Sequence, residues 1–258
     1  MTPRPDPIAV IVAAGRGTRL LPLTESRPKC LVPVGGRAIL DHQLDALADA
    51  GIGRTVVVAG YHADQVAAHV AAARHPVATE VIFNPFWAVA SSIGSVWAAR
   101  AHLDGAFLLL NGDTVFDGAV IRDALARVAD GVALVVEPTD AFAGDDMRVA
   151  VRNGRVTAVA KTLDAAGAGH RSLGLIRGSA GSAYPAALRE VVAAVDGVHA
   201  FHHDIVDRLA RTGRVAAIEV VGGWCEIDRP EDIQAWTRSH ERVAHDSAPP
   251  PSLAPARP

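Results

Sequence analysis

The residues near the amino terminus have the types and spacing of a phosphate site. An apolar run ends at Ala13, and a turn containing Gly15 and Gly17 follows it. Glycines in such a turn let backbone N–H groups approach phosphate oxygens, because no Cβ stands in the way. Arg19 and Lys29 add two cations that could neutralise a triphosphate. This segment is therefore a candidate phosphate loop.

Two common phosphate-binding motifs do not match this loop. The Rossmann dinucleotide fingerprint needs a third glycine where the sequence has Leu20, and the Gly-Lys-Ser/Thr of a Walker loop is absent. An NAD-binding oxidoreductase is further disfavoured because Ala59-Gly60-Tyr61 stands where the second strand should end in an acid. The glycine pair alone is as typical of an ordinary turn as of a phosphate loop.

Two acidic segments could hold a cation beside the loop. A strand expected at 106–110 leads to Asp113, and ligands of such sheets bind beyond the carboxyl ends of strands. Asp113 is thus placed to hold a hard cation such as Mg²⁺ together with phosphate oxygens. The second segment, WCEID, contains Glu226 and Asp228 on one face of an alternating strand. The alternative role for Asp228 is to cap the helix that follows.

Short β-branched runs alternate with longer amphipathic segments, which predicts an α/β fold: a Rossmann-like mixed, mostly parallel sheet flanked by helices. Strands are predicted at 8–13, 55–59, 80–83, 106–110, 132–136, 148–151, 156–160, 172–176, 215–220 and 224–227. Asn153-Gly154 indicates a hairpin between two of them. Helices are predicted at 39–50, 63–73, 93–101, 120–129, 183–195, 204–211 and 230–242.

Composition limits the classes of function. No Pro/Gly/Ser linker divides residues 1–245, so we expect one domain there, followed by a disordered Pro- and Ala-rich tail at 246–258. A formal net charge of −3 gives no case for nucleic acid. No apolar run reaches the roughly 20 residues of a membrane helix, and the first residues, MTPRPDP, lack the basic-then-apolar layout of a signal peptide. Cys30 and Cys225 lack metal-ligand spacing, which is typical of a reducing, cytoplasmic location.

The string that begins at the glycines is more specific than the glycines themselves. It reads GRGTRLLPLT, then RPK, then LVPV, and it resembles the signature of the sugar-phosphate and choline-phosphate nucleotidyltransferase superfamily. The resemblance implies a fold of the nucleotide-diphospho-sugar transferase type. It also implies that Arg19 contacts the triphosphate, that Lys29 bridges the phosphates of both substrates, and that Asp113 and Asp228 share the metal. The nucleotide-binding residues expected around the loop are Ala13, Ala14, Gly15, Gly17 and Thr18.

These parts together predict a metal-dependent group transfer. An oxygen of the acceptor attacks the α-phosphorus of the triphosphate in line, and pyrophosphate leaves. Positioning and charge neutralisation by Mg²⁺, Arg19 and Lys29 supply most of the catalysis. We expect no general base and no Ser or Cys nucleophile, because a phosphate monoester is already anionic at neutral pH.

The middle of the chain bears on the acceptor. Asn84 follows a strand, and Ser92 opens a helix whose free N–H groups could meet a base or a phosphate; Gly112 completes the expected nucleotide site. The segments DDMRV and NGRV, with Lys161, most resemble the choline-phosphate, inositol-phosphate and aminoalkylphosphonate cytidylyltransferases, over about residues 8 to 240. That resemblance implies that Lys161 binds the acceptor's phosphate. A solvated lysine at a strand end is the alternative.

A cationic acceptor such as phosphocholine would need aromatic faces and carboxylates. Trp224, Asp146 and Glu226 are the candidates, with Trp87, Trp97 and Asp145 also available. The loop VASS after Asn84 departs from the paired asparagines of the choline enzymes, which disfavours choline. We expect one of His202 and His203, with His202 the candidate, to contact the acceptor's phosphate. Adjacent helical histidines should not share one site or one metal.

The resulting prediction is transfer of a cytidylyl group from CTP to a phosphate- or phosphonate-bearing small molecule. The alternatives are a sugar-1-phosphate nucleotidyltransferase that makes a UDP-, dTDP- or GDP-sugar, and a catalytically silent regulatory module of the same fold. A glutamine-rich base-reading loop is missing near Asn84, which disfavours the first. The presence of Arg19, Lys29, Asp113 and Asp228 together disfavours the second. The sequence leaves the oligomeric state, including a homodimer, open.

Overall fold

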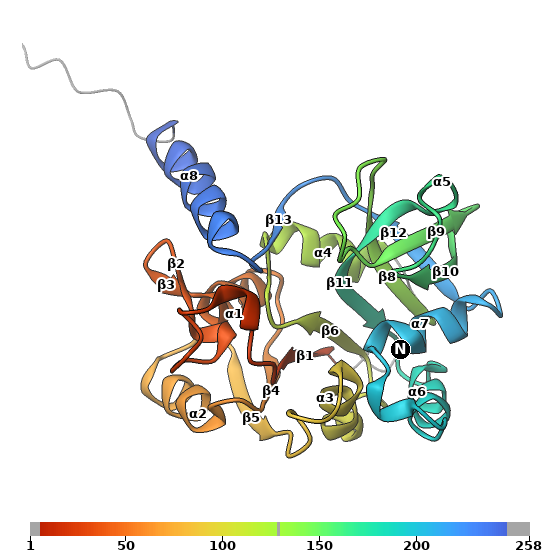
Figure 1. The fold of residues 1–258 in the computed structure, drawn as a ribbon, viewed down its shortest axis with the longest axis horizontal. Helices are drawn as coiled ribbons and strands as arrows, with labels where there is room; N and C mark the ends of the chain where they lie inside the picture. The colour runs from red at the N-terminus through yellow and green to blue at the C-terminus, as the bar shows by residue number, and fades with distance from the viewer. Residues whose placement is uncertain (1–5, 128–129, 247–258) are drawn as a thin grey trace, which may run out of the picture.

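A computed structural model describes residues 6–127 and 130–246 (Figure 1). Within them, a central sheet runs in the order β5-β4-β1-β6-β11-β8-β12-β10-β9. The strands of this sheet are β1 (Ile8–Ala13), β4 (Arg54–Ala59), β5 (Ala78–Phe83), β6 (Phe107–Asn111), β8 (Val132–Pro138), β9 (Arg148–Arg152), β10 (Arg155–Ala160), β11 (Gly169–Gly178) and β12 (Val215–Glu219). Two small ribbons join β2 (Pro33–Val34) to β3 (Arg37–Ala38), and β7 (Thr114–Phe116) to β13 (Trp224–Glu226).

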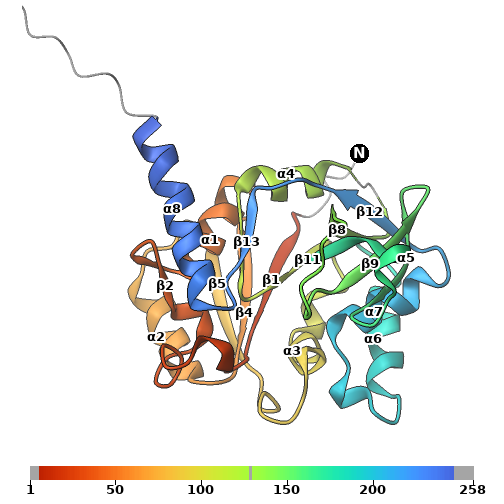
Figure 2. The same cartoon turned by 45° about the horizontal axis from the view of Figure 1, so that its top comes forward.

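Helices cover both faces of the sheet, as expected of an α/β protein. In Figure 2, α4 lies on one side of the sheet, while α3, α6 and α7 lie on the other. The helices are α1 (Ile39–Asp49), α2 (Ala63–Ala72), α3 (Ser92–Ala98), α4 (Gly118–Arg127), α5 (Ala165–Ala168), α6 (Tyr184–Val192), α7 (His202–Ala210) and α8 (Pro230–Asp246). Helix α8 extends away from the sheet in both views.

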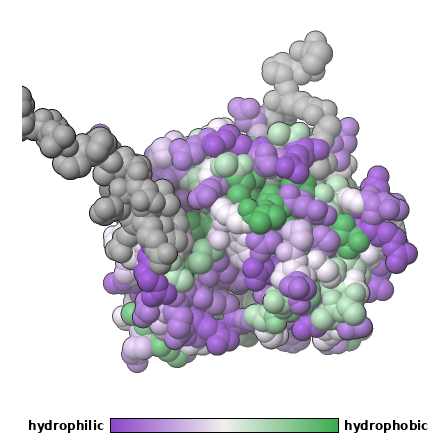
Figure 3. Space-filling view, turned by 90° about the horizontal axis from the view of Figure 1, so that it is seen from above, coloured by the Kyte–Doolittle hydropathy of each residue, from purple (hydrophilic) through white to green (hydrophobic). Residues whose placement is uncertain are grey.

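Alternation along the buried strands creates two separate cores. In β1, Ala9 and Ile11 pack in a cluster with α1, α2 and α4, whereas Val10 packs in a second cluster with α3, α6 and α7. Successive side chains of a strand point to opposite faces, so a continuous apolar run is needed where both faces are covered. The outer surface seen in Figure 3 is mainly hydrophilic, with a small apolar area near the middle of that face.

The sheet is mixed, as predicted, but parallel pairing is less extensive than the expected mostly parallel sheet. Strands β5, β4, β1 and β6 form one parallel block, and β8 pairs in parallel with β12. Strand β11 enters between β6 and β8 and is antiparallel to both. The β9–β10 hairpin is also antiparallel, and its turn at Asn153 and Gly154 has positive φ at both residues, as the Asn-Gly signal predicts. In the second part of the chain, β9 and β10 form a hairpin, whereas α6 and α7 connect β11 to β12, which pairs in parallel with β8.

Several boundaries differ from the sequence predictions. The helix expected at 93–101 ends at Ala98 and continues as a 3₁₀ turn, and the helix expected at 204–211 begins earlier, at His202. The predicted tail at 246–258 lies, apart from Asp246, outside the described residues. In the part of the chain that is described, no helix combines the length and apolar character needed to span a membrane.

Candidate active site

A cavity of about 390 Å³ lies where β1 and β6 end, beyond their carboxyl termini. Its walls come from the loop after β1, the loop between β5 and α3, the end of β6, the segment before β9, the first turn of α7, and β13. The predicted residues that line it are Ala13, Ala14, Gly15, Gly17, Arg19, Lys29, Asn84, Ser92, Gly112, Asp113, Asp146, Lys161, His202, Glu226 and Asp228.

The phosphate loop is held in one conformation by Gly17. This residue has φ +69°, and a Cβ built on it would lie 2.8 Å from Cβ of Lys29. The Thr24 hydroxyl donates to the Gly17 carbonyl oxygen at 2.8 Å. Gly17 is thus required both for its backbone conformation and for the close approach of Lys29. Gly15 differs, because a Cβ there would meet no atom within 4 Å.

A small third hydrophobic core packs against this loop. It joins Leu20 and Val32 of the loop region to Val115 of β7, Ile227 after β13 and Trp236 of α8. The same core therefore fixes the cations of the loop and the acidic segment of β13 relative to each other. The sequence prediction missed β7, although the side chains of its three residues are buried.

Lys29 is the centre of the charge network. Its Nζ donates to Asp113 Oδ2 at 2.7 Å and also to Asp228 Oδ1. Arg19 bonds both Asp228 and Asp145. Burial by itself would lower the pKa of Lys29, but the charges of Asp113 and Asp228 outweigh it and raise that pKa above its ordinary value. Lys29 therefore carries a full positive charge at neutral pH.

Three carboxylates face this network and form a candidate metal site. One oxygen from each of Asp113, Glu226 and Asp228 lies within 4.8 Å of the others. Desolvation of the Glu226 carboxyl, together with the nearby charges of Asp113 and Asp228, raises the pKa of Glu226 to about 8. The close approach of these three carboxylates is suited to a divalent ion, which would offset their mutual repulsion.

Backbone contacts place the two aspartates. The Gln43 amide on α1 donates to the carbonyl oxygens of Asn111 and Thr114, at 2.7 and 2.8 Å, on either side of Asp113. The backbone N–H of Ile227 donates to the carbonyl oxygen of Asp113 at 2.9 Å. This bond ties the end of β13 to the end of β6, although the two segments are far apart in the sequence.

The alternative role considered for Asp228, a helix cap, belongs to Asp232 instead. The Asp232 carboxylate accepts from the backbone N–H groups of Asp228 and Arg229 at 2.9 and 2.7 Å. The side chain of Asp228 is thereby left to bind Arg19 and Lys29.

Asn84 orders the loop between β5 and α3. Its Oδ1 accepts from the backbone N–H of Phe86 at 2.9 Å, and its Nδ2 donates to the Ser95 hydroxyl at 3.2 Å. Asn84 lines the cavity, but both ends of its amide are engaged within the protein. The residue therefore fixes the shape of the wall there.

Both histidines of the His202-His203 pair line the cavity, so the expectation that adjacent helical histidines should not share one site is wrong. Their ring centroids are 4.1 Å apart, and α7 begins at His202, so both rings hang from its first turn. Ser92 bonds His202 Nδ1, and Ser172 bonds His203 Nε2, each at 2.9 Å. Burial lowers the pKa of His202 to about 4 and that of His203 well below its ordinary value. Both are neutral at pH 7.

Two predicted site residues are not among those lining the cavity: Thr18 and Trp224. Thr18 begins a 3₁₀ turn. The Trp224 indole donates to Glu137 at 3.0 Å, and the guanidinium of Arg171 lies 4.8 Å from the centroid of its ring. Burial alone would raise the pKa of Glu137, but its bonds to Arg171, Trp224 and the Gly222 N–H outweigh burial and lower it.

The sequence prediction missed other lining residues. Lys161 Nζ lies 5.0 Å from the centroid of the Phe201 ring. Asp145, predicted only as an available carboxylate, forms an ion pair with Arg19. Ser172 was placed in a strand without a role, although it holds His203. No spacing pattern links these residues to their partners. Only the acid pair Asp145-Asp146 was a visible signal.

Comparisons with known proteins agree with this geometry. A sequence model described as "MobA-like NTP transferase domain" matches residues 9–176. The CMP-5'-(3-aminopropyl)phosphonate synthase of Streptomyces rubellomurinus is 32% identical over 243 residues, which are 90% of this chain and 38% of that protein. The UTP–glucose-1-phosphate uridylyltransferase of Haloferax volcanii is 35% identical over 132 residues, 50% of this chain and 54% of that protein. The chain thus spans less than two thirds of each relative.

A solved structure shows the same fold. The CTP:phosphocholine cytidylyltransferase of Streptococcus pneumoniae superposes with a TM-score of 0.73 and 20% sequence identity, covering 91% of this chain and 99% of that one. This likeness confirms the Rossmann-like α/β architecture with a mixed sheet between two helical layers.

Proposed function

The chain belongs to the MobA-like NTP transferase domain family, and from that premise we propose that it transfers a cytidylyl group from CTP to a small phosphate or phosphonate. One observation carries the proposal. The glycine loop, two cations and three carboxylates meet in a single cavity at the carboxyl ends of β1 and β6. These are the groups that phosphoryl and nucleotidyl transfer require, because such reactions depend on positioning and charge neutralisation.

Asp113, Glu226 and Asp228 fit a hard divalent ion such as Mg²⁺. Carboxylate oxygens are the ligands that Mg²⁺ prefers, and one oxygen from each of these residues lies within 4.8 Å of the others. When bound, Mg²⁺ would neutralise phosphate charge and make the α-phosphorus more electrophilic.

Lys29 and Arg19 are proposed to bind different phosphates of the triphosphate. Lys29 is buried, protonated and fixed between Asp113 and Asp228, so it neutralises the charge that grows on the α-phosphate oxygens during attack. The Arg19 side chain is 46% exposed and can exchange its carboxylate partners for the outer phosphates. It thereby stabilises the pyrophosphate as it leaves. No general base is needed, because the acceptor oxygen already carries negative charge.

The acceptor is proposed to bind beside Lys161 and the His202-His203 pair, which line the same cavity as the glycine loop. Lys161 supplies the positive charge for its phosphate or phosphonate, because the neighbouring histidines are neutral. The Ser92 hydroxyl accepts from the backbone N–H of His202 and can donate to Nδ1 of the same residue. The proton of the neutral ring then lies on Nε2, which is buried without a hydrogen-bond partner.

The surroundings favour an acceptor with a primary amine over one with a quaternary ammonium group. Trp224 is turned to Glu137, and the ring of Phe201 is already covered by Lys161, so Trp87 is the aromatic residue left for a quaternary ammonium group among those that line the cavity. Asp145 loses Arg19 as a partner when that arginine turns to the triphosphate, and can then bind an ammonium group. An aminoalkyl phosphonate or phosphate has both the anion for Lys161 and the cation for Asp145.

CTP is favoured by the extent of the sequence matches. The relative matched over 90% of this chain is a CMP-phosphonate synthase, whereas the match to the uridylyltransferase covers 50%. A sugar-1-phosphate uridylyltransferase is therefore the second candidate.

A pyrophosphate-release screen tests the proposal. Four nucleoside triphosphates are combined with 2-aminoethylphosphonate, phosphocholine, inositol phosphate and glucose-1-phosphate in the presence of Mg²⁺. We expect turnover with CTP and the aminoalkylphosphonate, and none with the Asp113→Asn, Asp228→Asn double variant. Strict preference for UTP and glucose-1-phosphate would replace the proposal by the second candidate. Absence of any metal-dependent turnover would overturn both.

A further inference from the structure

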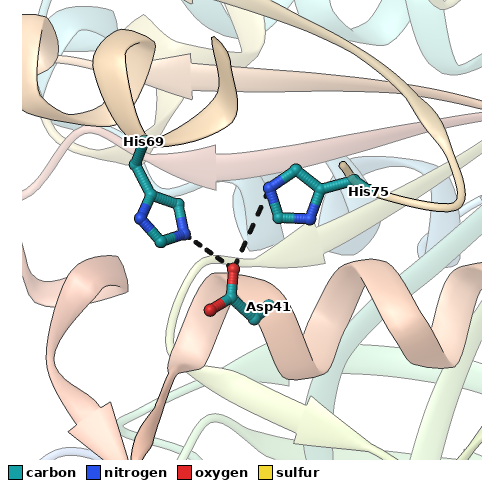
Figure 4. A group of neighbouring side chains, drawn as sticks. All are labelled: Asp41, His69 and His75. Carbon is teal, nitrogen blue, oxygen red and sulfur yellow. Dashed lines mark hydrogen bonds and ion pairs between the residues drawn. The ribbon is translucent and has the colours of Figure 1, made fainter. Parts of the chain in front are cut away.

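A second cluster of metal-ligating side chains lies outside the cavity lining. It consists of Asp41 on α1, His69 on α2 and His75 in the loop between α2 and β5 (Figure 4). One ligand atom from each residue lies within 4.8 Å of the others. Figure 4 shows both imidazole rings turned toward the same carboxylate oxygen.

The helix start fixes the orientation of the Asp41 carboxylate. Asp41 lies in the first turn of α1, and its Oδ2 accepts from the backbone N–H of Ala38 at 3.2 Å. Its other oxygen, Oδ1, faces the histidines, 2.7 Å from His69 Nε2 and 3.9 Å from His75 Nε2. The two carboxylate oxygens therefore have separate tasks, one in the helix cap and one in the cluster.

A simple hydrogen-bonded pair explains only part of this arrangement. The 2.7 Å contact between His69 and Asp41 is an ordinary hydrogen bond, but 3.9 Å is too long for His75. The side chain of His75 is only 8% exposed, and its Nε2 is buried without a hydrogen-bond partner. A buried, unpartnered nitrogen that faces a carboxylate oxygen is a position at which a further ligand can bind.

We propose that Asp41, His69 and His75 bind a single divalent transition-metal ion, with Zn²⁺ as the preferred ion. Two imidazole nitrogens and one carboxylate oxygen are the donor set of three-ligand zinc sites, which keep a fourth position for water. Ligand atoms around tetrahedral zinc lie roughly 3.3 Å apart. The present spacings of 2.7 and 3.9 Å bracket that value, so small rotations of the two rings complete the site.

The site differs in chemistry from the three carboxylates of the cavity. Oxygen ligands alone suit Mg²⁺, whereas imidazole favours zinc and its neighbours. The two sites therefore select different ions, and the zinc site goes beyond the proposed transferase function.

The position of the cluster gives the ion a structural role. Helix α1 carries Gln43, which holds the backbone on both sides of Asp113. Helix α2 carries Gln65, whose amide donates to the carbonyl oxygen of Ser26 at 2.9 Å, shortly before Lys29. An ion shared by α1, α2 and the following loop links the supports of the metal-binding and phosphate-binding segments. Binding to the folded state alone raises the melting temperature.

Zinc titration of the tag-free, chelator-treated chain tests the proposal. Zn²⁺ is added against a chromophoric competitor, and Co²⁺ is added separately to record the visible absorption of tetrahedral coordination. We expect one tight zinc ion per chain in the wild type, and also in the Asp113→Asn, Asp228→Asn double variant that removes the carboxylate site. His199→Gln, which alters an exposed histidine outside the cluster, should bind like the wild type.

His75→Gln and His69→Gln should each weaken zinc binding roughly 100-fold, because each removes a direct ligand. Both should lose the rise in melting temperature that zinc gives the wild type. The His69 side chain is 30% exposed, so His69→Gln provides the readout if the buried His75 variant fails to fold. Equal zinc affinity in the wild type and His69→Gln would overturn the proposal. Zinc binding that disappears only in the double aspartate variant would overturn it as well.

Discussion

In the part of the cavity that we assign to the nucleotide (the nucleotide half), defined by the loop 13–29 after β1, the functional groups come from one continuous segment. In the part that we assign to the acceptor (the acceptor half), defined by Lys161, Ser172 and the His202-His203 pair, they come from the end of β10, from β11 and from α7. The first half has a sequence signature because one turn must satisfy strict backbone demands at Gly17 and Lys29. The second half depends on side chains that long-range pairing brings together, so it leaves only isolated residues in the sequence.

Replacement of Lys29 should have the largest effect on the nucleotide half. Lys29→Ala removes the only buried cation between Asp113 and Asp228 among the described residues, and we expect kcat to fall by roughly 1000-fold. The measurement is steady-state pyrophosphate release, with circular dichroism to confirm folding. Arg127→Ala, which removes an exposed arginine of α4, is the matched control and should keep normal turnover. Near-normal turnover of Lys29→Ala would exclude Lys29 from the mechanism.

Substitution of two glycines should distinguish the effect of backbone strain on stability from the effect of displacing Lys29 on catalysis. Gly17→Ala adds a Cβ against Lys29 as well as the cost of positive φ, about 1–2 kcal/mol. We expect a loss of melting temperature and a fall in kcat of about 100-fold, because small displacements of a catalytic group are costly.

Gly36→Ala is the matched control for Gly17→Ala. Gly36 has φ +81°, and a Cβ added there would meet no atom within 4 Å, so the substitution should lower the melting temperature and leave kcat unchanged. If both variants lose the same activity, the contact between Gly17 and Lys29 has no catalytic role.

Replacement of Lys161 should affect the acceptor half alone. Lys161→Ala removes the cation assigned to the acceptor anion, and we expect KM for the acceptor to rise roughly tenfold while KM for the triphosphate is unchanged. Arg155→Ala, at the start of the preceding strand β10 and bonded to the Gly213 carbonyl oxygen, serves as the control. A rise in KM for the triphosphate instead would move Lys161 into the nucleotide half.

The same contrast explains how far the sequence could be interpreted. Strand β1 was predicted with its observed bounds because a run buried on both faces has an unambiguous pattern. Strand β7 was missed because three residues give no period, and its partner β13 lies far along the chain. Trp224 was predicted to bind the acceptor because an indole can contact a ligand as well as pack within the protein. Only the fold shows that this indole donates a hydrogen bond to Glu137.

Ion pairs between residues far apart in the sequence could not be predicted either. Arg19 and Asp145 are separated by 126 positions, and no local rule connects them. The cluster of Asp41, His69 and His75 lacks metal-ligand spacing because its members come from two helices and a loop. Most residues that line the cavity could be predicted from their residue type and local sequence. Their hydrogen-bond and ion-pair partners could not, because the fold brings those partners from distant segments.

Acid sensitivity should give the smallest effect and should come from the acceptor half. The pKa of His202 falls to about 4 in the folded chain from an ordinary 6.5, because the ring is buried. The unfolded chain therefore binds a proton near pH 6.5 that the folded chain refuses until about pH 4. The stability that His202 contributes is complete above pH 6.5 and is lost as the pH falls toward 4.

His202→Gln should therefore lose less melting temperature than the wild type between pH 7.5 and pH 5, by a few degrees. His199→Gln, an exposed histidine, is the control and should follow the wild type. Parallel melting curves for the wild type and His202→Gln would show that the ring does not stay neutral in the folded state.

Every role assigned to the cavity depends on transfer of the nucleotidyl group of a nucleoside triphosphate, through its α-phosphorus, to an acceptor anion. ³¹P NMR of the wild type with CTP, Mg²⁺ and 2-aminoethylphosphonate measures that transfer directly. We expect a pair of coupled signals from a new cytidylyl–phosphonate linkage, together with pyrophosphate, and neither in Lys29→Ala. Formation of cytidine diphosphate and inorganic phosphate, without the coupled pair, would contradict this function.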